Sequence, residues 1–175
     1  MRLKNKIAVI TGAGSGFGKG IAIRFAEEGA KVVIVDINLE SAEKVAAEIG
    51  ENALAFEGDV SQDGDVSSIF ERTLKHFGRV DILVNNAGTT HRNKPMTEVT
   101  EEEFDQIFAV NVKSVFLTAK HGVPLMKKQG HGVILNVAST AGLRPRPGLA
   151  WYNTSKGAMI TATKAMAIEL ATFKI

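Results

Sequence analysis

The chain has 175 residues, 45% of them apolar, and a formal charge of +2 at pH 7. We expect a single dinucleotide-binding domain spanning residues 1–175, which buries roughly 70% of its unfolded surface. The small, scattered positive charge gives no reason to expect a nucleic-acid-binding protein.

The chain contains no cysteine, which excludes disulfides and thiolate metal sites. No histidine pair stands at metal-ligand spacing, so no metal is expected. Because no apolar run could span a bilayer and the first strand begins within a few residues of the amino terminus, we expect no membrane contact, no signal peptide and a cytoplasmic location. The histidines are interpreted as surface or loop residues: His76, His91, His121 and His131.

The first predicted strand, 6–11, leads into a glycine-rich turn, Thr11-Gly-Ala-Gly-Ser-Gly-Phe-Gly18, and then into a helix-patterned run. Glycines between a strand and a helix allow a tight turn and leave helix N–H groups free, which favours a pyrophosphate. The spacing is Thr-Gly-x-x-x-Gly-x-Gly rather than Gly-x-Gly-x-x-Gly. The alternative is a plain structural turn.

The second predicted strand, 31–36, ends at Asp36, twenty residues after Gly16. A carboxylate there can accept hydrogen bonds from the adenosine ribose hydroxyls. It would disfavour a 2′-phosphate about 5 Å away by roughly 1.7 kcal/mol, more than tenfold, even with bulk-water screening. NAD is therefore expected rather than NADP. The alternative is that Asp36 caps the helix that starts near Asn38.

Further strands are predicted near 53–57, 81–85 and 132–138, with helices between them. This alternation predicts a doubly wound parallel α/β sheet of the Rossmann type with helices on both faces. Ligands bind such sheets beyond the carboxyl ends of the strands, where strand order reverses. The glycine turn, Asp36, the segment 85–88 and Ser139 all fall at such ends.

A long helical stretch is predicted from about 101 to 129, broken by Pro124. Thr100 followed three residues later by Glu103 is typical of a capping box at its start. The stretch contains Asn111, and an asparagine inside a helix usually points to solvent.

Ser139 follows the fifth predicted strand, and its hydroxyl could donate to a substrate carbonyl. The alternative is that it starts a turn. No Gly-x-Ser-x-Gly motif surrounds it and no histidine is placed as its base, so a hydrolase is not expected.

Tyr152 and Lys156 stand four residues apart on the last predicted helix, so both can face one site. An ammonium about 5 Å from the phenol, at an effective dielectric near 20, stabilises the phenolate by about 3.3 kcal/mol and lowers the phenol pKa by roughly 2.4. The pair is therefore interpreted as a proton donor tuned for neutral pH. Taken alone, Tyr-x-x-x-Lys can also be an ordinary helix surface.

Together these motifs resemble the short-chain dehydrogenase/reductase family, in order and in spacing, over essentially the whole chain. The resemblance rests on Thr11-Gly-x-x-x-Gly-x-Gly18, Asp59-Val60, Asn85-Asn-Ala-Gly88, Asn111, Ser139 and Tyr152-x-x-x-Lys156. Within the family, the chain is similar to bacterial 3-oxoacyl-carrier-protein reductases and glucose 1-dehydrogenase-like enzymes.

The resemblance implies a catalytic set and a cofactor site. The catalytic residues would be Asn111, Ser139, Tyr152 and Lys156, with Asn111 holding a water and Lys156 also holding the nicotinamide ribose. The cofactor-binding residues would be Gly12, Ser15, Gly16, Phe17, Gly18, Asp36, Asp59, Val60, Asn86, Ala87 and Gly88, together with Tyr152 and Lys156. Asp59 and Val60 would contact adenine, and 86–88 would line the adenosine-side ribose.

We therefore expect an NAD-dependent oxidoreductase that moves hydride between nicotinamide and a secondary alcohol or ketone, free or acyl-carrier-bound. Assembly as a homodimer or homotetramer through 101–129 and 152–172 is implied by the family. Its members continue into two further strands and a substrate lid, which this sequence lacks. The alternative function is thus a dinucleotide-binding or assembly module without turnover. Arg144 and Arg146 indicate either an anionic substrate or a solvated loop.

Overall fold

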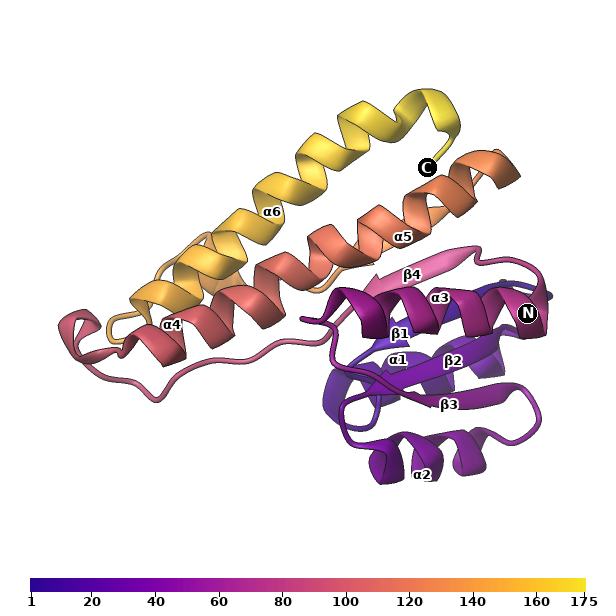
Figure 1. Ribbon diagram of the computed structural model, residues 1–175, viewed down its shortest axis with the longest axis horizontal. Coiled ribbons are helices and arrows are strands. Elements are labelled where there is room, and N and C mark those ends of the chain that lie inside the picture. Colours follow the sequence, from indigo (N-terminus) through magenta and orange to yellow (C-terminus); the bar gives the residue numbers. More distant parts are fainter.

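A computed structural model describes residues 1–175 as one parallel sheet between two layers of helices (Figure 1). The five strands are β1 Ile7–Thr11, β2 Lys31–Asp36, β3 Ala53–Glu57, β4 Ile82–Asn85 and β5 Val133–Asn136. They lie in the order β3-β2-β1-β4-β5, and every neighbouring pair is parallel. The predicted doubly wound α/β fold is confirmed.

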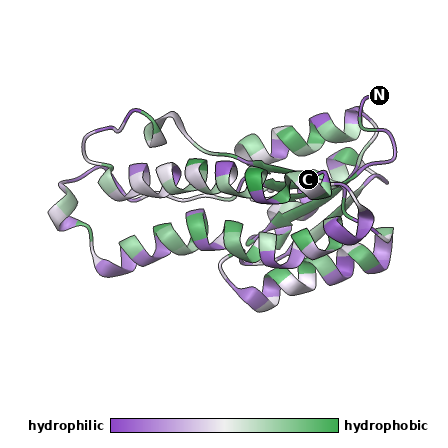
Figure 2. Ribbon diagram, turned by 90° about the horizontal axis from the view of Figure 1, so that it is seen from above, coloured by the Kyte–Doolittle hydropathy of each residue, from purple (hydrophilic) through white to green (hydrophobic).

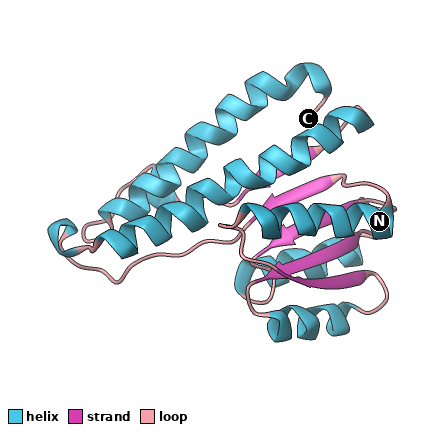
Figure 3. Ribbon diagram, viewed as in Figure 1, coloured by secondary structure: helices cyan, strands magenta, loops and turns pink.

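Six α-helices connect and cover the strands (Figure 3). They are α1 Gly16–Glu27, α2 Leu39–Ile49, α3 Asp63–Phe77, α4 Glu101–Phe108, α5 Ser114–Gln129 and α6 Ala150–Leu170. None of them combines the length and the hydrophobicity that a bilayer-spanning segment requires.

The core consists of two apolar layers because side chains alternate across each strand. In β1, Ala8 and Ile10 join the layer under α1 and α2, whereas Val9 joins the layer under α3 and α5. In Figure 2 the strands in the middle of the molecule are largely hydrophobic, and the helices around them carry both hydrophobic and hydrophilic residues. Burial on both faces explains why the central strands are almost continuously apolar in sequence.

Strand order reverses between β1 and β4, whose carboxyl ends therefore diverge into connections on opposite faces. A crevice forms at such a point, because the loops leaving the two strands move apart. The glycine turn after β1 and the segment that follows β4 border this crevice.

The segment 101–129 differs from the prediction of a helix broken at Pro124. Pro124 lies inside α5, on its exposed side. Proline has no N–H to donate to the Lys120 carbonyl oxygen, and water can hydrogen-bond that oxygen instead. The irregularity lies instead at a π-helical turn, Ala109–Lys113, between α4 and α5.

The fifth strand is shorter than the predicted 132–138. The Val137 N–H still donates to the Asn85 carbonyl oxygen at 2.9 Å. Because β4 ends at Asn85, the residues after Val137 have no further ladder partner on that side.

Candidate functional site

The glycine-rich turn joins β1 to α1 by a route that only glycine follows easily. Gly12 and Gly16 have φ angles of 60° and 54°. A Cβ on Gly12 would lie 2.8 Å from Ala87 Cα, and one on Gly18 would collide with the Gly12 carbonyl oxygen. The turn therefore packs tightly against the end of β4, and the first N–H groups of α1 have no partner within the helix.

Asp36, at the end of β2, holds this turn in place. Its Oδ2 accepts a hydrogen bond from the Gly14 N–H at 2.9 Å, and its Oδ1 accepts one from the Asn38 N–H at 3.0 Å. The alternative that Asp36 caps α2 is wrong, because the cap is Asn38, whose side chain accepts from the Ser41 N–H. Asp36 is thereby oriented toward the crevice.

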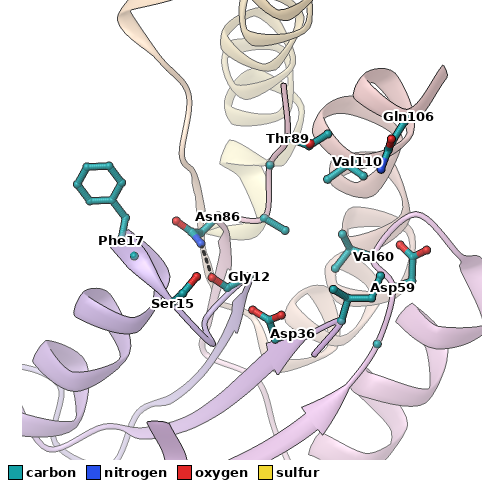
Figure 4. A pocket seen from close by; sticks show the side chains of 15 residues that line it. Gly12, Ser15, Phe17, Asp36, Asp59, Val60, Asn86, Thr89, Gln106 and Val110 are labelled. Carbon is teal, nitrogen blue, oxygen red and sulfur yellow. Dashed lines mark hydrogen bonds between the residues drawn. The ribbon is translucent and has the colours of Figure 1, made fainter. Parts of the chain in front are cut away.

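Asn86 and Thr11 lock the carboxyl ends of β1 and β4 together. The Asn86 Nδ2 donates to the Thr11 carbonyl oxygen at 2.9 Å. It also donates to the Gly12 carbonyl oxygen at 3.0 Å, which is the dashed line in Figure 4. The Thr11 hydroxyl oxygen accepts from the N–H groups of Asn86 and Ala87, both at 3.1 Å. The start of the segment that follows β4 is therefore fixed relative to the glycine turn.

A cavity of about 440 Å³ opens beside these strand ends (Figure 4). Every residue predicted for the cofactor-binding turn and strand ends lines it, except Gly18, which is buried beneath the turn. The lining residues are Gly12, Ser15, Gly16, Phe17, Asp36, Ile37, Gly58, Asp59, Val60, Asn86, Ala87, Gly88, Thr89, Gln106 and Val110. The Phe17 side chain is 84% exposed and points away from Asp36 and Asp59.

Five of these lining residues were missed by the sequence reasoning. Ile37, Gly58 and Thr89 are direct neighbours of predicted residues, so extending each predicted segment by one position would have found them. Gln106 and Val110 come from α4 and the π-helical turn, and no local pattern marks them.

Asn111 is completely buried, contrary to the usual solvent-facing position of a helical asparagine. Its Nδ2 donates to the Thr89 carbonyl oxygen at 2.9 Å and to the Ser155 hydroxyl at 3.0 Å. Its Oδ1 accepts from the Thr89 N–H at 2.8 Å. Asn111 therefore ties the segment after β4 to α6, and the π-helical turn places its side chain there.

Lys156 projects from α6 into the same region. It is 5% exposed, and its Nζ donates to the Val137 carbonyl oxygen at 3.0 Å. A Cβ on Gly88 would lie 3.3 Å from both Lys156 Nζ and Asn111 Oδ1, so the two side chains meet at this part of the cavity wall. Burial of the ammonium lowers the pKa of Lys156 below its ordinary value.

Tyr152 lies in the first turn of α6, and the centre of its ring is 6.0 Å from Lys156 Nζ. Its hydroxyl has no hydrogen-bond partner within the chain, and the residue is half-buried. Neither Tyr152 nor Ser139 lines the cavity beside the strand ends. The phenol is thus available to a ligand rather than committed to the fold.

Ser139 lies three residues beyond β5, and its oxygen accepts a hydrogen bond from the Ala141 N–H at 3.1 Å. The interpretation that it starts a turn is therefore confirmed, and its hydroxyl hydrogen stays free to donate. The turn that it caps, Thr140–Gly142, packs on α6, since a Cβ on Gly142 would lie 2.7 Å from the Lys156 carbonyl carbon.

Trp151, Arg144 and Arg146 lie outside the cavity. Trp151 packs edge-on against Phe104 at 5.3 Å, and its Nε1 donates to the Met96 carbonyl oxygen. Arg144 and Arg146 are exposed and form no ion pair.

His91 lies in a loop, which is one of the two positions expected for the histidines, but it is buried. It is 6% exposed, its Nδ1 lies 2.7 Å from the Arg92 carbonyl oxygen, and its Nε2 has no partner within the chain. The other three histidines are exposed or partly exposed, and no group of three or more His, Asp or Glu residues is arranged to hold a metal ion.

Comparison with known proteins gives a family for this arrangement. The model of the short chain dehydrogenase family matches residues 6–175. The chain belongs to this family. It is therefore an oxidoreductase, as the sequence motifs predicted.

Individual relatives are similar over almost the whole chain. The chain is 48% identical over 174 residues to 4-formylbenzenesulfonate dehydrogenase TsaC1/TsaC2 of Comamonas testosteroni, which covers 98% of this chain and 69% of the relative. It is 40% identical over 174 residues to the 3-oxoacyl-[acyl-carrier-protein] reductase FabG of Thermotoga maritima, covering 98% of this chain and 70% of the relative.

A crystal structure of a 3-ketoacyl-(acyl-carrier-protein) reductase from Brucella melitensis, complexed with NADH, has the same fold. It matches with a TM-score of 0.98 and 54% identity, over 99% of this chain and 72% of that chain. The resemblance to reductases of this type is thereby confirmed.

Proposed function

We propose that this chain is a single-domain, cytoplasmic, NAD-dependent oxidoreductase that transfers hydride between nicotinamide and a secondary alcohol or ketone. The observation that carries the proposal is the meeting of Lys156 and Asn111 at Gly88, on the wall of the cavity that the glycine turn and Asp36 border. The cavity suits a dinucleotide, and Lys156, which meets its wall at Gly88, lies 6.0 Å from the centre of the Tyr152 ring.

The residues of the cavity fit a dinucleotide. The free N–H groups at the start of α1 and the positive end of the helix dipole would hold the pyrophosphate. Asp36 would accept from the adenosine ribose hydroxyls, Asp59 and Val60 would contact the adenine, and 86–88 would form the floor. The Brucella melitensis neighbour, 54% identical, is described as complexed with NADH. When bound, the nicotinamide would supply or accept the hydride.

NAD is proposed over NADP because of Asp36. Its carboxylate lines the cavity and is oriented by two backbone N–H groups, so it cannot swing away easily from a 2′-phosphate. No arginine or lysine lines the same cavity to compensate for that charge.

The protein's own groups would handle the proton. The Tyr152 hydroxyl would give a proton to, or take one from, the substrate oxygen, while the free Ser139 hydroxyl hydrogen would polarise that oxygen. The Lys156 Nζ lies 6.0 Å from the centre of the Tyr152 ring, so its ammonium would stand beside the phenol during this proton transfer.

Asn111 would act mainly by holding other groups. Both of its N–H bonds are already directed to Thr89 and Ser155, so its amide nitrogen has no donor left for a water. The water implied by the family resemblance would instead bind the remaining Oδ1 lone pair or a carbonyl freed in the π-helical turn.

The substrate would be a small alcohol or ketone, free or acyl-carrier-bound. The relatives quoted above are named for 4-formylbenzenesulfonate and for a 3-oxoacyl-[acyl-carrier-protein], and a sulfonate is anionic. Arg144 and Arg146 are exposed without an acidic partner, on the loop that leads into α6, and would attract such a charge.

A second candidate is a dinucleotide-binding or assembly module without turnover. It is favoured by the open surroundings of the substrate side: Val133 and Leu135 on β5 are 57% and 44% exposed, and Tyr152 and Ser139 lie outside the cavity. A site that is open to water strengthens catalytic electrostatics less than a closed one.

The two candidates differ in turnover, so binding and chemistry are measured separately. Calorimetric titration with NADH and NADPH is followed by assays of NAD reduction with a panel of secondary alcohols. We expect saturable NADH binding, weaker NADPH binding, and turnover that falls at least about a hundredfold in Tyr152→Phe without loss of NADH binding. Thr154→Val, which changes an exposed residue in the same helical turn, is the matched control.

Binding without turnover by the unaltered chain would support the second candidate. Failure of the folded chain to bind either dinucleotide would contradict both. Trp151 fluorescence is a poor reporter here, because its ring packs against Phe104 rather than lining the cavity.

A further inference from the structure

A hydrogen-bond network of four polar side chains crosses the molecule from α5 to α6. The Thr118 hydroxyl donates to Asn85 Oδ1 at 2.9 Å, and Asn85 Nδ2 donates to Asn136 Oδ1 at 2.8 Å. Asn136 Nδ2 then donates to the Thr163 hydroxyl oxygen at 2.9 Å. The Thr163 hydroxyl donates to the Met159 carbonyl oxygen at 2.8 Å. The Thr118 hydroxyl also lies 3.1 Å from the Val115 carbonyl oxygen, so it shares its one hydrogen between that oxygen and Asn85 Oδ1.

The two buried members of this network, Asn85 and Thr118, would destabilise the fold if they lost their hydrogen-bond partners. Asn85 and Thr118 are 3% and 2% exposed, and Asn85 ends β4 directly after the buried apolar residues Ile82–Val84. A buried polar group without its partner costs about 1–3 kcal/mol. The Asn85 and Asn136 side chains can meet because the two residues are paired in the parallel register of β4 and β5. The bonds therefore favour one placement of these four elements.

The network lies on the same helical segments as the proposed catalytic side chains, a short distance further along each. Thr118 follows Asn111 by seven residues, and Thr163 follows Lys156 by seven. On α6, which is a regular α-helix, seven residues are about two turns, roughly 10 Å, and return to the same face. Asn111 lies in the π-helical turn Ala109–Lys113, so this relation holds for Lys156 and Thr163 only. The Val137 carbonyl, which accepts from Lys156, belongs to the residue next to Asn136. The last residue of β5 and the residue after it therefore bond α6 at two points, Val137 at Lys156 and Asn136 two turns further along, at Thr163.

Direct packing between α5 and α6 cannot set their separation alone. An apolar groove of about 320 Å³ runs between them, and Phe116 on its edge is 62% exposed. Two sets of polar contacts thus bridge a gap that side-chain packing leaves open. One is the four-residue network, and the other is the Asn111–Ser155 hydrogen bond.

We propose that the network of Thr118, Asn85, Asn136 and Thr163 holds α6 against the sheet. It thereby sets the positions of Lys156 and Tyr152 relative to Asn111. The four are positioning residues, since none of them reaches the cavity. The inference rests on the proposed function in so far as Tyr152 and Lys156 carry the proton chemistry.

The decisive variant is Thr163→Val, which keeps the β-branched shape and removes the acceptor of Asn136 Nδ2. Thr163 is exposed, so the variant is expected to fold. Thr163→Ser keeps a hydroxyl at this position and should retain wild-type kcat and the wild-type Lys156 titration. Thr161→Val, at an exposed position of α6 outside the network, is the matched control. Thr118→Val tests the buried end.

With turnover as the readout, we expect kcat of Thr163→Val to fall about tenfold, because small misplacements of catalytic groups carry penalties up to about a hundredfold. KM for the dinucleotide should stay within about twofold, since the cavity itself is untouched. The pH at which kcat is half-maximal should move as the spacing between Lys156 and Tyr152 changes. Wild-type kcat and an unchanged pH profile in Thr163→Val, or equal losses in Thr161→Val, would overturn the proposal.

A second readout needs no turnover. The Lys156 side chain is followed by NMR with ¹³Cε-labelled lysine during a pH titration, using Lys156→Met to assign its signal. Burial holds the Lys156 pKa down, so a loosened α6 that admits water should raise it in Thr163→Val and not in Thr161→Val. An unchanged Lys156 titration would overturn the positioning role. Absence of turnover in the unaltered chain would overturn the proposed function alone.

Discussion

At the scale of single residues, Asp36 shows how a side chain can serve fold and ligand at once. Both of its carboxylate oxygens accept backbone N–H groups, from Gly14 and from Asn38, so it is oriented before a dinucleotide arrives. A preorganised carboxylate keeps its hydrogen-bond geometry at little entropic cost on binding.

This orientation leads to a prediction about cofactor choice. Asp36→Asn should increase NADPH affinity about fifteenfold, because roughly 1.7 kcal/mol of repulsion between the carboxylate and the 2′-phosphate is removed. NADH affinity should fall modestly as the acceptor to the ribose weakens. Both constants are measured by calorimetry. Glu57→Gln is the control, since Glu57 is the exposed β3 partner of Asp36 and lies outside the cavity. An unchanged ratio of the two affinities would argue against Asp36 as the discriminating residue.

Lys156 supports a prediction about pH and stability. Because burial lowers its pKa in the folded state, the unfolded chain binds more protons at alkaline pH. The destabilisation is complete below the lowered folded-state pKa and disappears as pH rises toward the unfolded value near 10.4. The free energy of unfolding should therefore rise from pH 7 to pH 10 in the unaltered chain, relative to Lys156→Met.

Urea denaturation at the two pH values measures this difference. Lys164→Met is the matched control, because Lys164 is exposed on the same helix. If the gap between the unaltered chain and Lys156→Met does not change with pH, Lys156 is not titrating from a buried site.

At the scale of elements, the start of α4 is stabilised by a reciprocal cap. The Glu103 N–H donates to the Thr100 hydroxyl at 3.3 Å, and the Thr100 N–H donates to Glu103 Oε2 at 2.9 Å. Glu103 also bonds Lys94 Nζ at 2.6 Å, and that ammonium together with the Thr100 N–H holds the Glu103 pKa below its usual range. The predicted capping box is confirmed.

Thr100→Ala should lower the free energy of unfolding by about 1 kcal/mol, the usual cost of a lost N-cap. Thr97→Ala is the control, since Thr97 is exposed three residues earlier and its side chain makes no hydrogen bond. Chemical denaturation of the two variants gives the comparison. Equal stability losses would mean that the cap contributes nothing specific.

The elements also show where sequence reasoning succeeded and where it failed. Strands β1 and β2 follow directly from their continuous apolar runs, because a parallel strand covered on both faces must be apolar throughout. The break predicted at Pro124 was wrong, because a proline on the exposed side of a helix loses only one hydrogen bond that water can replace. The π-helical turn at Asn111 has no local signal, since the bonds that the Asn111 side chain makes there come from Thr89 and Ser155.

At the scale of the whole molecule, the apolar groove between α5 and α6 is the surface on which assembly can be tested. Its lining is apolar apart from Glu169: Val112, Val115, Phe116, Ala119, Met159, Ala162, Ala165, Met166 and Glu169. Exposed apolar surface of this kind typically marks an interaction site. Homodimer or homotetramer formation through it is our proposal.

Phe116→Asp should weaken self-association about thirtyfold, the effect of losing a central aromatic contact worth about 2 kcal/mol. The variant should fold, because the Phe116 side chain is 62% exposed in the isolated chain. Light scattering and sedimentation at micromolar concentrations measure the change. Leu143→Asp, at a 72% exposed apolar side chain outside the groove, is the control. Equal association in both variants would place the interface elsewhere.

The sequence by itself determined the family, the parallel sheet and most of the residues along the cavity. Glycines and acidic residues that follow apolar strands must gather at one edge, because all parallel strands end there. Only the tertiary structure decided that Gln106 and Val110 join that cavity, that Asn111 is buried, and that Thr118 is linked to Thr163. Those contacts join segments far apart in the chain, and their register depends on how helices pack on the sheet rather than on any local pattern.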